Sequence, residues 1–147
     1  MKAVIQRVTR AKVTVDSEIT GEIGKGFLVL LGVHKDDGEK EAVKLADKVC
    51  GLRVFEDENG KMNLNLETAG GEILVVSQFT LYADCNSRRP GVTLAARPDT
   101  AVPLYELFMS ECSKRGFHVE HGEFGADMTV ASENDGPVTI IMDTGEL

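Results

Sequence analysis

A five-residue apolar run constrains the fold of this chain more than any other feature. Residues 27–31 read Phe-Leu-Val-Leu-Leu, and Gly26 and Gly32 flank them. The run is short for a buried helix, and glycines at its ends are typical of strand boundaries. Because such a strand has no polar face to turn toward water, other elements must cover both of its faces. The sequence therefore predicts a strand covered on both sides.

Several other segments have the two-residue period of strands. Residues 3–15 are rich in β-branched side chains, and a turn at Asp16-Ser17 leads into a return strand through Ile19 and Ile23. A turn at Asp57-Glu58-Asn59-Gly60 joins a short strand at 52–55 to alternating apolar residues at 62–66. Further strands are predicted at 73–81, 128–131 and 138–142, the last two joined by a turn at 133–137.

Two segments have the period of helices instead. Ala42, Leu45, Ala46 and Val49 recur on one face, with Asp36 and Glu39 as the expected capping box and Gly51 as the C-terminal glycine. A second helix is predicted over 100–115, with Pro103 in its first turn and Gly116 as its end. We therefore expect one domain over residues 1–147 of the α+β class. Its sheets should be mostly antiparallel, barrel-like or sandwiched, with two main helices.

The charge of the chain argues against a protein that coats a nucleic acid. Sixteen basic and 24 acidic side chains give a net charge of −8. The basic residues are clustered, however: residues 1–15 contain four and no acid, and residues 85–97 contain Arg88, Arg89 and Arg97 and no acid. These clusters indicate either ordinary surface charge or a small patch that meets the end of an RNA strand.

No segment predicts a membrane span, a signal peptide or a disulfide framework. No apolar run approaches the roughly 18–20 residues that cross a bilayer, and charges interrupt the first 13 residues. Cys50, Cys85 and Cys112 are few and scattered. We expect a reduced, cytoplasmic protein without contact to a membrane.

The sequence contains no strong signature of a metal or phosphate site. His118 and His121 lie three residues apart in a predicted strand region, which would point their rings to opposite faces, so surface histidines are favoured over metal ligands. A Ser-His-Asp arrangement stays open, but there is no G-x-S-x-G elbow. We expect no metal and no cofactor.

Two segments stand out once these signatures are set aside. Ser77-Gln78-Phe79-Thr80-Leu81 places three hydrogen-bonding side chains at the end of an apolar strand, which is consistent either with a strand leaving the core or with a chemical pocket. Asn134-Asp135-Gly136-Pro137-Val138-Thr139 has the composition of a simple turn. Neither segment by itself identifies a function.

Together with three other stretches, these segments resemble the D-aminoacyl-tRNA deacylase family. The resemblance extends over the whole chain, and the combination of Ser-Gln-Phe-Thr with Gly-Pro-Val-Thr at this separation is highly specific. The other stretches are 3–8 (Ala-Val-Ile-Gln-Arg-Val), 60–64 (Gly-Lys-Met-Asn-Leu) and Arg89-Pro90. The resemblance implies hydrolysis of the ester bond of D-aminoacyl-tRNA, which releases the D-amino acid and tRNA in chiral proofreading. Whether glycyl-tRNA is also cleaved stays open.

The resemblance also implies how the site is built. Gly136-Pro137 matches a cis pair that the family inserts into the pocket of the other subunit of a homodimer, where backbone groups exclude an L side chain. Arg7 matches an arginine that steadies this loop; the alternative is an ordinary solvated arginine on a strand. Only the acceptor end of the tRNA would enter the site.

Ser77, Gln78, Phe79 and Thr80 match the catalytic pocket of the family. Backbone N–H groups of Phe79 and Thr80 would hold the oxyanion, whereas a nucleophilic Thr80 would need a base that the segment does not offer. Phe79 either stacks on the terminal adenine or packs in the core, and Phe124 and Met128 are expected to line the pocket. Two rival functions remain: a non-catalytic binding module, and a hydrolase of a different aminoacyl ester.

Overall fold

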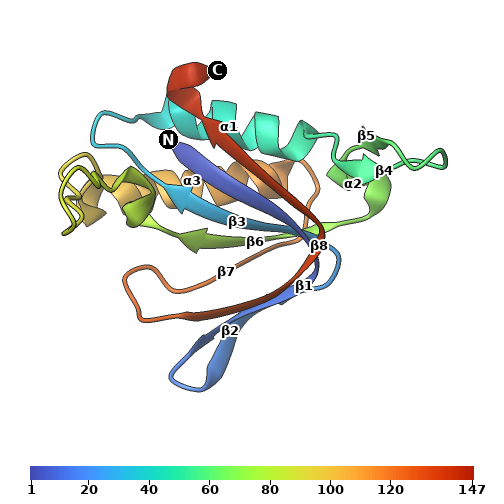
Figure 1. The fold of residues 1–147 in the computed structure, drawn as a ribbon, viewed down its shortest axis with the longest axis horizontal. Coiled ribbons are helices and arrows are strands. Elements are labelled where there is room, and N and C mark those ends of the chain that lie inside the picture. The colour runs from blue at the N-terminus through green and yellow to red at the C-terminus, as the bar shows by residue number, and fades with distance from the viewer.

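The computed structural model describes residues 1–147 and contains one large sheet, two long helices and short connecting elements (Figure 1). The large sheet contains six strands: β1 (Lys2–Val15), β2 (Glu18–Ile23), β3 (Gly26–Gly32), β6 (Glu72–Ser77), β7 (Val119–His121) and β8 (Thr129–Asp143). The remaining elements are α1 (Glu39–Gly51), β4 (Phe55–Glu56), β5 (Met62–Leu64), α2 (Leu66–Ala69), the 3₁₀ helix η1 (Phe79–Tyr82), α3 (Pro98–Lys114) and the 3₁₀ helix η2 (Thr144–Glu146).

The large sheet has the order β2-β1-β3-β6-β7, and β8, which lies off this path, pairs with β1 as well. Strand β1 is antiparallel to β2, β3 and β8, whereas β3/β6 and β6/β7 are parallel. The sheet curls until β2 lies against β7, where a Cβ on Gly21 would come within 2.5 Å of the carbonyl oxygen of His121. The predicted α+β fold is confirmed, with a nearly closed, barrel-like sheet of mostly antiparallel but mixed pairing.

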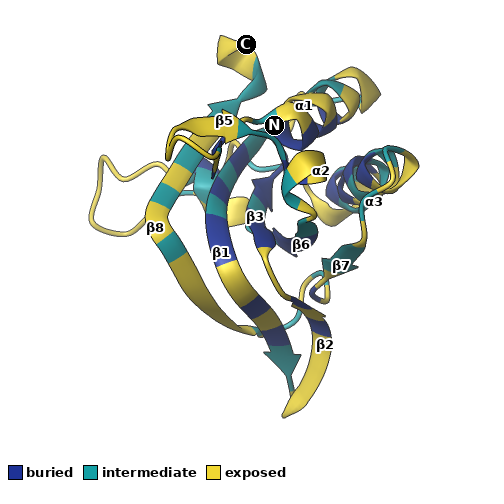
Figure 2. Cartoon of the chain, turned by 90° about the vertical axis from the view of Figure 1, so that its right-hand side faces the viewer, coloured by how far each residue is buried: buried dark blue, intermediate teal, exposed yellow.

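Strand β3 is buried on both faces, as its unbroken apolar run predicts. Phe27, Val29 and Leu31 face a core formed with α1 and α3, which cover one side of the sheet (Figure 2). Leu28 faces a smaller cluster with Val8, Val13, Ile23, Leu74 and Val76 on the concave side of the curled sheet. The two clusters explain why the strand has no polar alternation.

The helices lie where their periods predict, but their ends differ from the prediction. Helix α1 has Gly38 as its N-cap residue, and the Glu41 carboxylate accepts a hydrogen bond from Gly38 N–H at 2.8 Å. The predicted capping pair of Asp36 and Glu39 is therefore wrong. Gly51 is the last helical residue, rather than a cap with positive φ. Helix α3 begins at Pro98, which places Pro103 in the second turn instead of the first.

Five predicted strands have different bounds because tertiary contacts override the local pattern. Residues 52–54 are not in a strand, and Leu66 begins the short helix α2, capped by Asn65. Strand β6 ends at Ser77, and the chain then turns into η1. Most importantly, residues 129–143 form one long strand, so the predicted turn at 133–137 is wrong.

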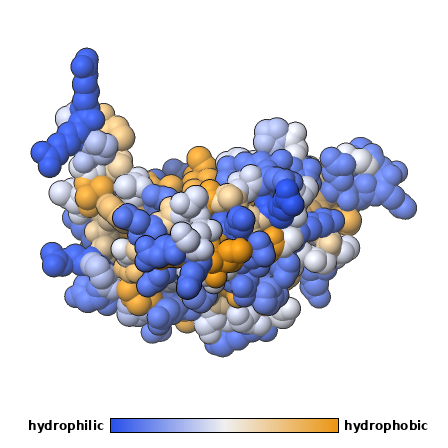
Figure 3. Space-filling view, turned by 90° about the horizontal axis from the view of Figure 1, so that it is seen from below, coloured by the Kyte–Doolittle hydropathy of each residue, from blue (hydrophilic) through white to orange (hydrophobic).

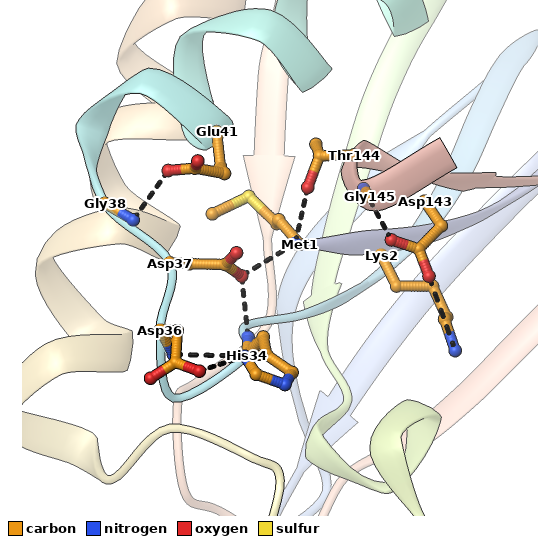
Figure 4. A network of polar contacts seen from close by, with 10 residues as sticks. All are labelled: Met1, Lys2, His34, Asp36, Asp37, Gly38, Glu41, Asp143, Thr144 and Gly145. Atoms are coloured by element: carbon orange, nitrogen blue, oxygen red, sulfur yellow. Dashed lines mark hydrogen bonds and ion pairs between the residues drawn. The ribbon is translucent and has the colours of Figure 1, made fainter. Parts of the chain in front are cut away.

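The start of β1 is tied to two other elements by a compact polar network (Figure 4). The amino group of Met1 lies 2.7 Å from a carboxylate oxygen of Asp37 and donates to the hydroxyl of Thr144 at 2.8 Å. The same oxygen of Asp37 accepts a hydrogen bond from His34 N–H at 2.7 Å. Asp37 is thus used in this network, and the carboxylate of Asp36, the predicted cap, lies 3.8 Å from His34 Nδ1.

Candidate active site

A cavity of about 370 Å³ opens between the end of β6 and the N-terminal half of α3. Its size lies at the small end of the range for ligand sites. Apolar side chains dominate its walls, and polar groups come from the end of β6 and from the loop before α3. The lining residues are Leu31, Val33, Ser77, Gln78, Phe79, Val92, Ala95, Ala96, Arg97, Pro98, Ala101, Tyr105, Phe124 and Gly125.

The Ser77–Thr80 segment forms the polar rim of this cavity. Gln78 N–H donates to Leu31 O at 2.8 Å, which extends the β3/β6 pairing by one residue, and Leu81 N–H donates to Gln78 O at 3.2 Å. The N–H groups of Phe79 and Thr80 precede that first bond of η1, so neither has a partner within the helix. The side-chain amide of Gln78 donates to the Thr80 hydroxyl.

Three aromatic rings give the cavity its apolar character. Phe79 is 58% exposed, which excludes the interpretation that it packs in the core. Tyr105 is buried and donates its hydroxyl proton to Val75 O at 3.0 Å, and burial raises its pKa. Phe124 meets the Tyr105 ring edge-on, with 5.9 Å between centroids. The cavity therefore has one exposed ring at its mouth and two rings fixed by packing.

Gly136 and Pro137 lie in a bulge of β8 directly opposite Arg7. Thr139 pairs with Gln6 and Asn134 pairs with Val8, so the four residues 135–138 face the single residue Arg7. The bond between Gly136 and Pro137 is cis, and Gly136 has a φ of +124°.

Arg7 is a buried charged residue, at 5% exposure, and it fixes the bulge. Its Nε donates to Asp135 O at 3.1 Å, and its Nη1 donates to Val54 O at 2.6 Å. Nε also lies 3.4 Å from the Asp135 carboxylate. A solvated strand arginine, the alternative to a positioning role, is therefore excluded.

The bulge and the cavity are far apart within one chain. Arg7 pairs with Phe27, which pairs with Ile73, whereas Ser77 lies four residues further along β6. That offset corresponds to about 13 Å along the strands, and β8 and β6 are three strand spacings, or about 14 Å, apart across the sheet. No residue of the bulge lines the cavity.

A family model described as D-Tyr-tRNA(Tyr) deacylase matches residues 4–143, a range that includes both the cavity and the bulge. The chain belongs to this deacylase family. The D-aminoacyl-tRNA deacylase of Thermus aquaticus is 56% identical over 99% of this chain and 97% of its own length. The enzyme of the same name from Clostridioides difficile is 54% identical over 99% of both chains. The family resemblance predicted from the sequence is confirmed.

Two solved structures share the deacylase fold. One is named "c-Myc DNA Unwinding Element Binding Protein"; it is 44% identical, covers 97% of this chain and 98% of its own, and has a TM-score of 0.92. The other, described as a probable eukaryotic D-amino acid tRNA deacylase, has a TM-score of 0.80 over 96% of this chain and 97% of its own. At 16% identity, that second likeness concerns the fold alone.

The deacylase fold brings together only part of the residue set predicted from the sequence. Ser77, Gln78, Phe79 and Phe124 line the cavity; Thr80 lies on the rim, bound to Gln78. Met128 packs against Gly122 and Val13 on the concave side of the sheet, outside the cavity lining. Sequence reasoning missed the wall formed by 92–97 and Tyr105, because residues 92–97 have no period and Tyr105 lies on the apolar stripe of α3.

Proposed function

We propose that this protein hydrolyses the ester bond that joins a D-amino acid to the 3′-terminal adenosine of tRNA. The observation that carries the proposal is the Ser77–Thr80 rim on an aromatic-walled cavity, in a chain that belongs to the deacylase family. The exposed ring of Phe79 offers a surface on which the terminal adenine stacks, an interaction worth about 1–3 kcal/mol per base. Only the acceptor end has to enter a cavity of this size.

Backbone groups supply the electrostatic part of the reaction. Water attacks the ester carbonyl, and the N–H groups of Phe79 and Thr80 stabilise the negative charge that develops on its oxygen. Ser77 and Gln78 orient the substrate and the water, and the 2′-hydroxyl of the terminal ribose assists. Thr80 acts through its backbone, because its hydroxyl accepts a hydrogen bond from Gln78 and no carboxylate or imidazole contacts it.

The complete site requires a second copy of the chain. The separation between the bulge and the cavity supports this step, because one chain cannot bring Gly136-Pro137 to its own Ser77. Strand β8 pairs only with β1 and leaves its other edge free, and its Ile141 side chain is 68% exposed. A twofold homodimer through this exposed region would insert the bulge of one subunit into the cavity of the other.

In that arrangement the carbonyl groups of Gly136 and Pro137 occupy the space of an L side chain. Backbone atoms held by Arg7 reject L-amino acids whatever their side chain, while D side chains point elsewhere and are accepted. Glycine has no side chain to reject, so glycyl-tRNA is the additional substrate that this selection would admit.

Matched D- and L-tyrosyl-tRNA, incubated with purified protein without added metal, test the proposal. We expect loss of the D-ester and survival of the L-ester. Equal cleavage of both esters would refute chiral selection, and cleavage of neither would favour the non-catalytic binding module. Binding of duplex DNA by the same preparation tests whether the DNA-binding property in the name of the c-Myc DNA Unwinding Element Binding Protein extends to this chain.

A further inference from the structure

Three arginines beside the cavity have no partner within the protein. The chain contains seven arginines, and Arg7, Arg10, Arg53 and Arg115 all donate hydrogen bonds to acceptors in the protein. Arg88, Arg89 and Arg97 make no hydrogen bond from their side chains and no ion pair, and all three are exposed. In a chain of net charge −8 that contains 24 carboxylates, unpaired arginines clustered in one segment indicate a binding partner outside the chain.

The loop that carries Arg88 and Arg89 is closed at its base and projects from the molecule. Asp84 and Gly91 exchange two backbone hydrogen bonds, at 2.7 and 2.9 Å. The Ser87 hydroxyl donates to Arg89 O at 2.7 Å, which orders the tip. The carboxylate of Asp84 accepts from Asn86 N–H at 2.9 Å and forms no ion pair with either arginine.

The base of this loop is part of the cavity wall. Val92, the residue after Gly91, lines the cavity, as does Arg97. Arg88 lies four positions before Val92 in the chain, so its backbone lies at most about 14 Å from that wall. The loop forms the left end of the molecule in Figure 1, and hydrophilic side chains extend from that end in Figure 3.

We propose that Arg88 and Arg89 bind the sugar-phosphate backbone of the tRNA acceptor end, a few nucleotides before the ester that occupies the cavity. This inference rests on the proposed function. Guanidinium groups match phosphate oxygens in a bidentate geometry, and contacts of this kind fix position without reading sequence. The two arginines thereby place the 3′ end of the tRNA over the Ser77–Thr80 rim. Without them, the negatively charged RNA would be repelled by the otherwise acidic protein surface.

The salt dependence of tRNA binding tests this assignment directly. We compare the double variant Arg88→Gln/Arg89→Gln with Lys40→Gln/Lys48→Gln, which removes two exposed charges from α1 and thus matches the change in net charge. The probe is uncharged tRNA, and its Kd is measured from 50 to 200 mM KCl. Each lost phosphate contact should lower the slope of log Kd against log salt by about 0.7–0.9.

For two contacts, wild type should lose about 7–12-fold more affinity than the arginine variant over this fourfold range of salt. The lysine variant should keep the wild-type slope. An arginine variant with the wild-type slope, or an equal change in the lysine variant, would overturn the proposal.

A second measurement separates phosphate binding from shaping of the cavity. A D-aminoacyl ester of adenosine contains the cleaved bond and no phosphate. The arginine variant should raise KM for D-aminoacyl-tRNA and leave cleavage of the adenosine ester unchanged. Equal losses on both substrates would mean that the loop shapes the cavity, which contradicts the proposal. If wild type cleaves no D-ester at all, the proposed function fails, while the salt slope still decides the role of the arginines.

Discussion

Replacement of Arg7 by lysine tests whether a single buried guanidinium fixes the β8 bulge. Arg7 donates from two nitrogens to carbonyl oxygens on different segments, Val54 O at 2.6 Å and Asp135 O at 3.1 Å. A lysine ammonium is a single point and lacks the planar fork that serves both directions. We therefore expect Arg7→Lys to keep one of the two contacts and to lose the other.

The expected loss of stability in Arg7→Lys follows from the burial of the hydrogen bond that is lost. A hydrogen bond from a charged donor contributes about 1.5–3 kcal/mol, and the carbonyl left behind is buried near Val54, which is 6% exposed. The free energy of unfolding should fall by about this amount. A typical domain has about 5–15 kcal/mol, so the variant should remain folded at about 25 °C.

Urea unfolding at one fixed protein concentration measures this loss, because association with a second copy would make stability depend on concentration. Arg10→Lys is the matched control, since Arg10 lies on the same strand and pairs with Glu133 while its side chain is 72% exposed. That substitution should cost less than about 1 kcal/mol.

Deacylation provides a readout that stability alone does not change. With the bulge released, folded Arg7→Lys should lose D-specific activity or begin to cleave L-tyrosyl-tRNA, whereas Arg10→Lys should behave as wild type. The reasoning would be refuted if Arg7→Lys were as stable as Arg10→Lys, or if its preference for the D-ester were unaltered.

Three further predictions concern single substitutions. Thr80→Ala should reduce the single-turnover rate by less than about tenfold, because its backbone N–H remains; a collapse of thousandsfold, typical of a lost nucleophile, would contradict this. Gly136→Ala should lower the free energy of unfolding by about 1–3 kcal/mol, because φ is +124° and the new Cβ would lie 2.9 Å from Val138. Gly91→Ala, with no atom within 4 Å, is its control and should stay within about 0.5 kcal/mol of wild type in the same urea titration.

The last prediction concerns the pH dependence of stability. The hydrogen bond from Gly38 N–H holds the pKa of Glu41 below its usual 4.5. The contribution of the Glu41 carboxylate to the free energy of unfolding is therefore present above pH 4.5 and disappears as the pH falls through the lowered pKa. Glu41→Gln should therefore be less stable than wild type by about 0.3–1 kcal/mol at about pH 7, and a pH series of thermal unfolding should show the two proteins converging in acid.

Prediction from the sequence succeeded where the signal lies within a few adjacent residues. The covered strand at 27–31, the turn at Asp16-Ser17 and both long helices follow from local period and turn chemistry, and the structure contains each of them. It failed at element ends. The local pattern predicts Asp36 as the cap of α1, but the loop before the helix is organised around the Met1 amino group, whose position depends on the whole sheet.

The candidate site also has features that the sequence predicts and features that only tertiary contacts decide. The two motifs and the family are readable from the sequence, because they depend on residue identity alone. That residues 135–138 form a bulge instead of part of a turn is decided by β1, which pairs with residues on both sides of the bulge from more than 120 positions away. The cavity wall at 92–97 likewise exists only because the end of β6 packs beside α3.

The sequence by itself thus determined both long helices, the core of most strands and the motifs that the chain carries, since hydrophobic period and residue chemistry act between near neighbours. Only the tertiary structure decided that Arg7 is buried against the bulge, that Phe79 is exposed, and that the bulge lies three strands away from the Ser77–Thr80 segment. The physical reason is that strand pairing, register and burial are set by contacts between residues far apart in the chain. No local pattern encodes those contacts.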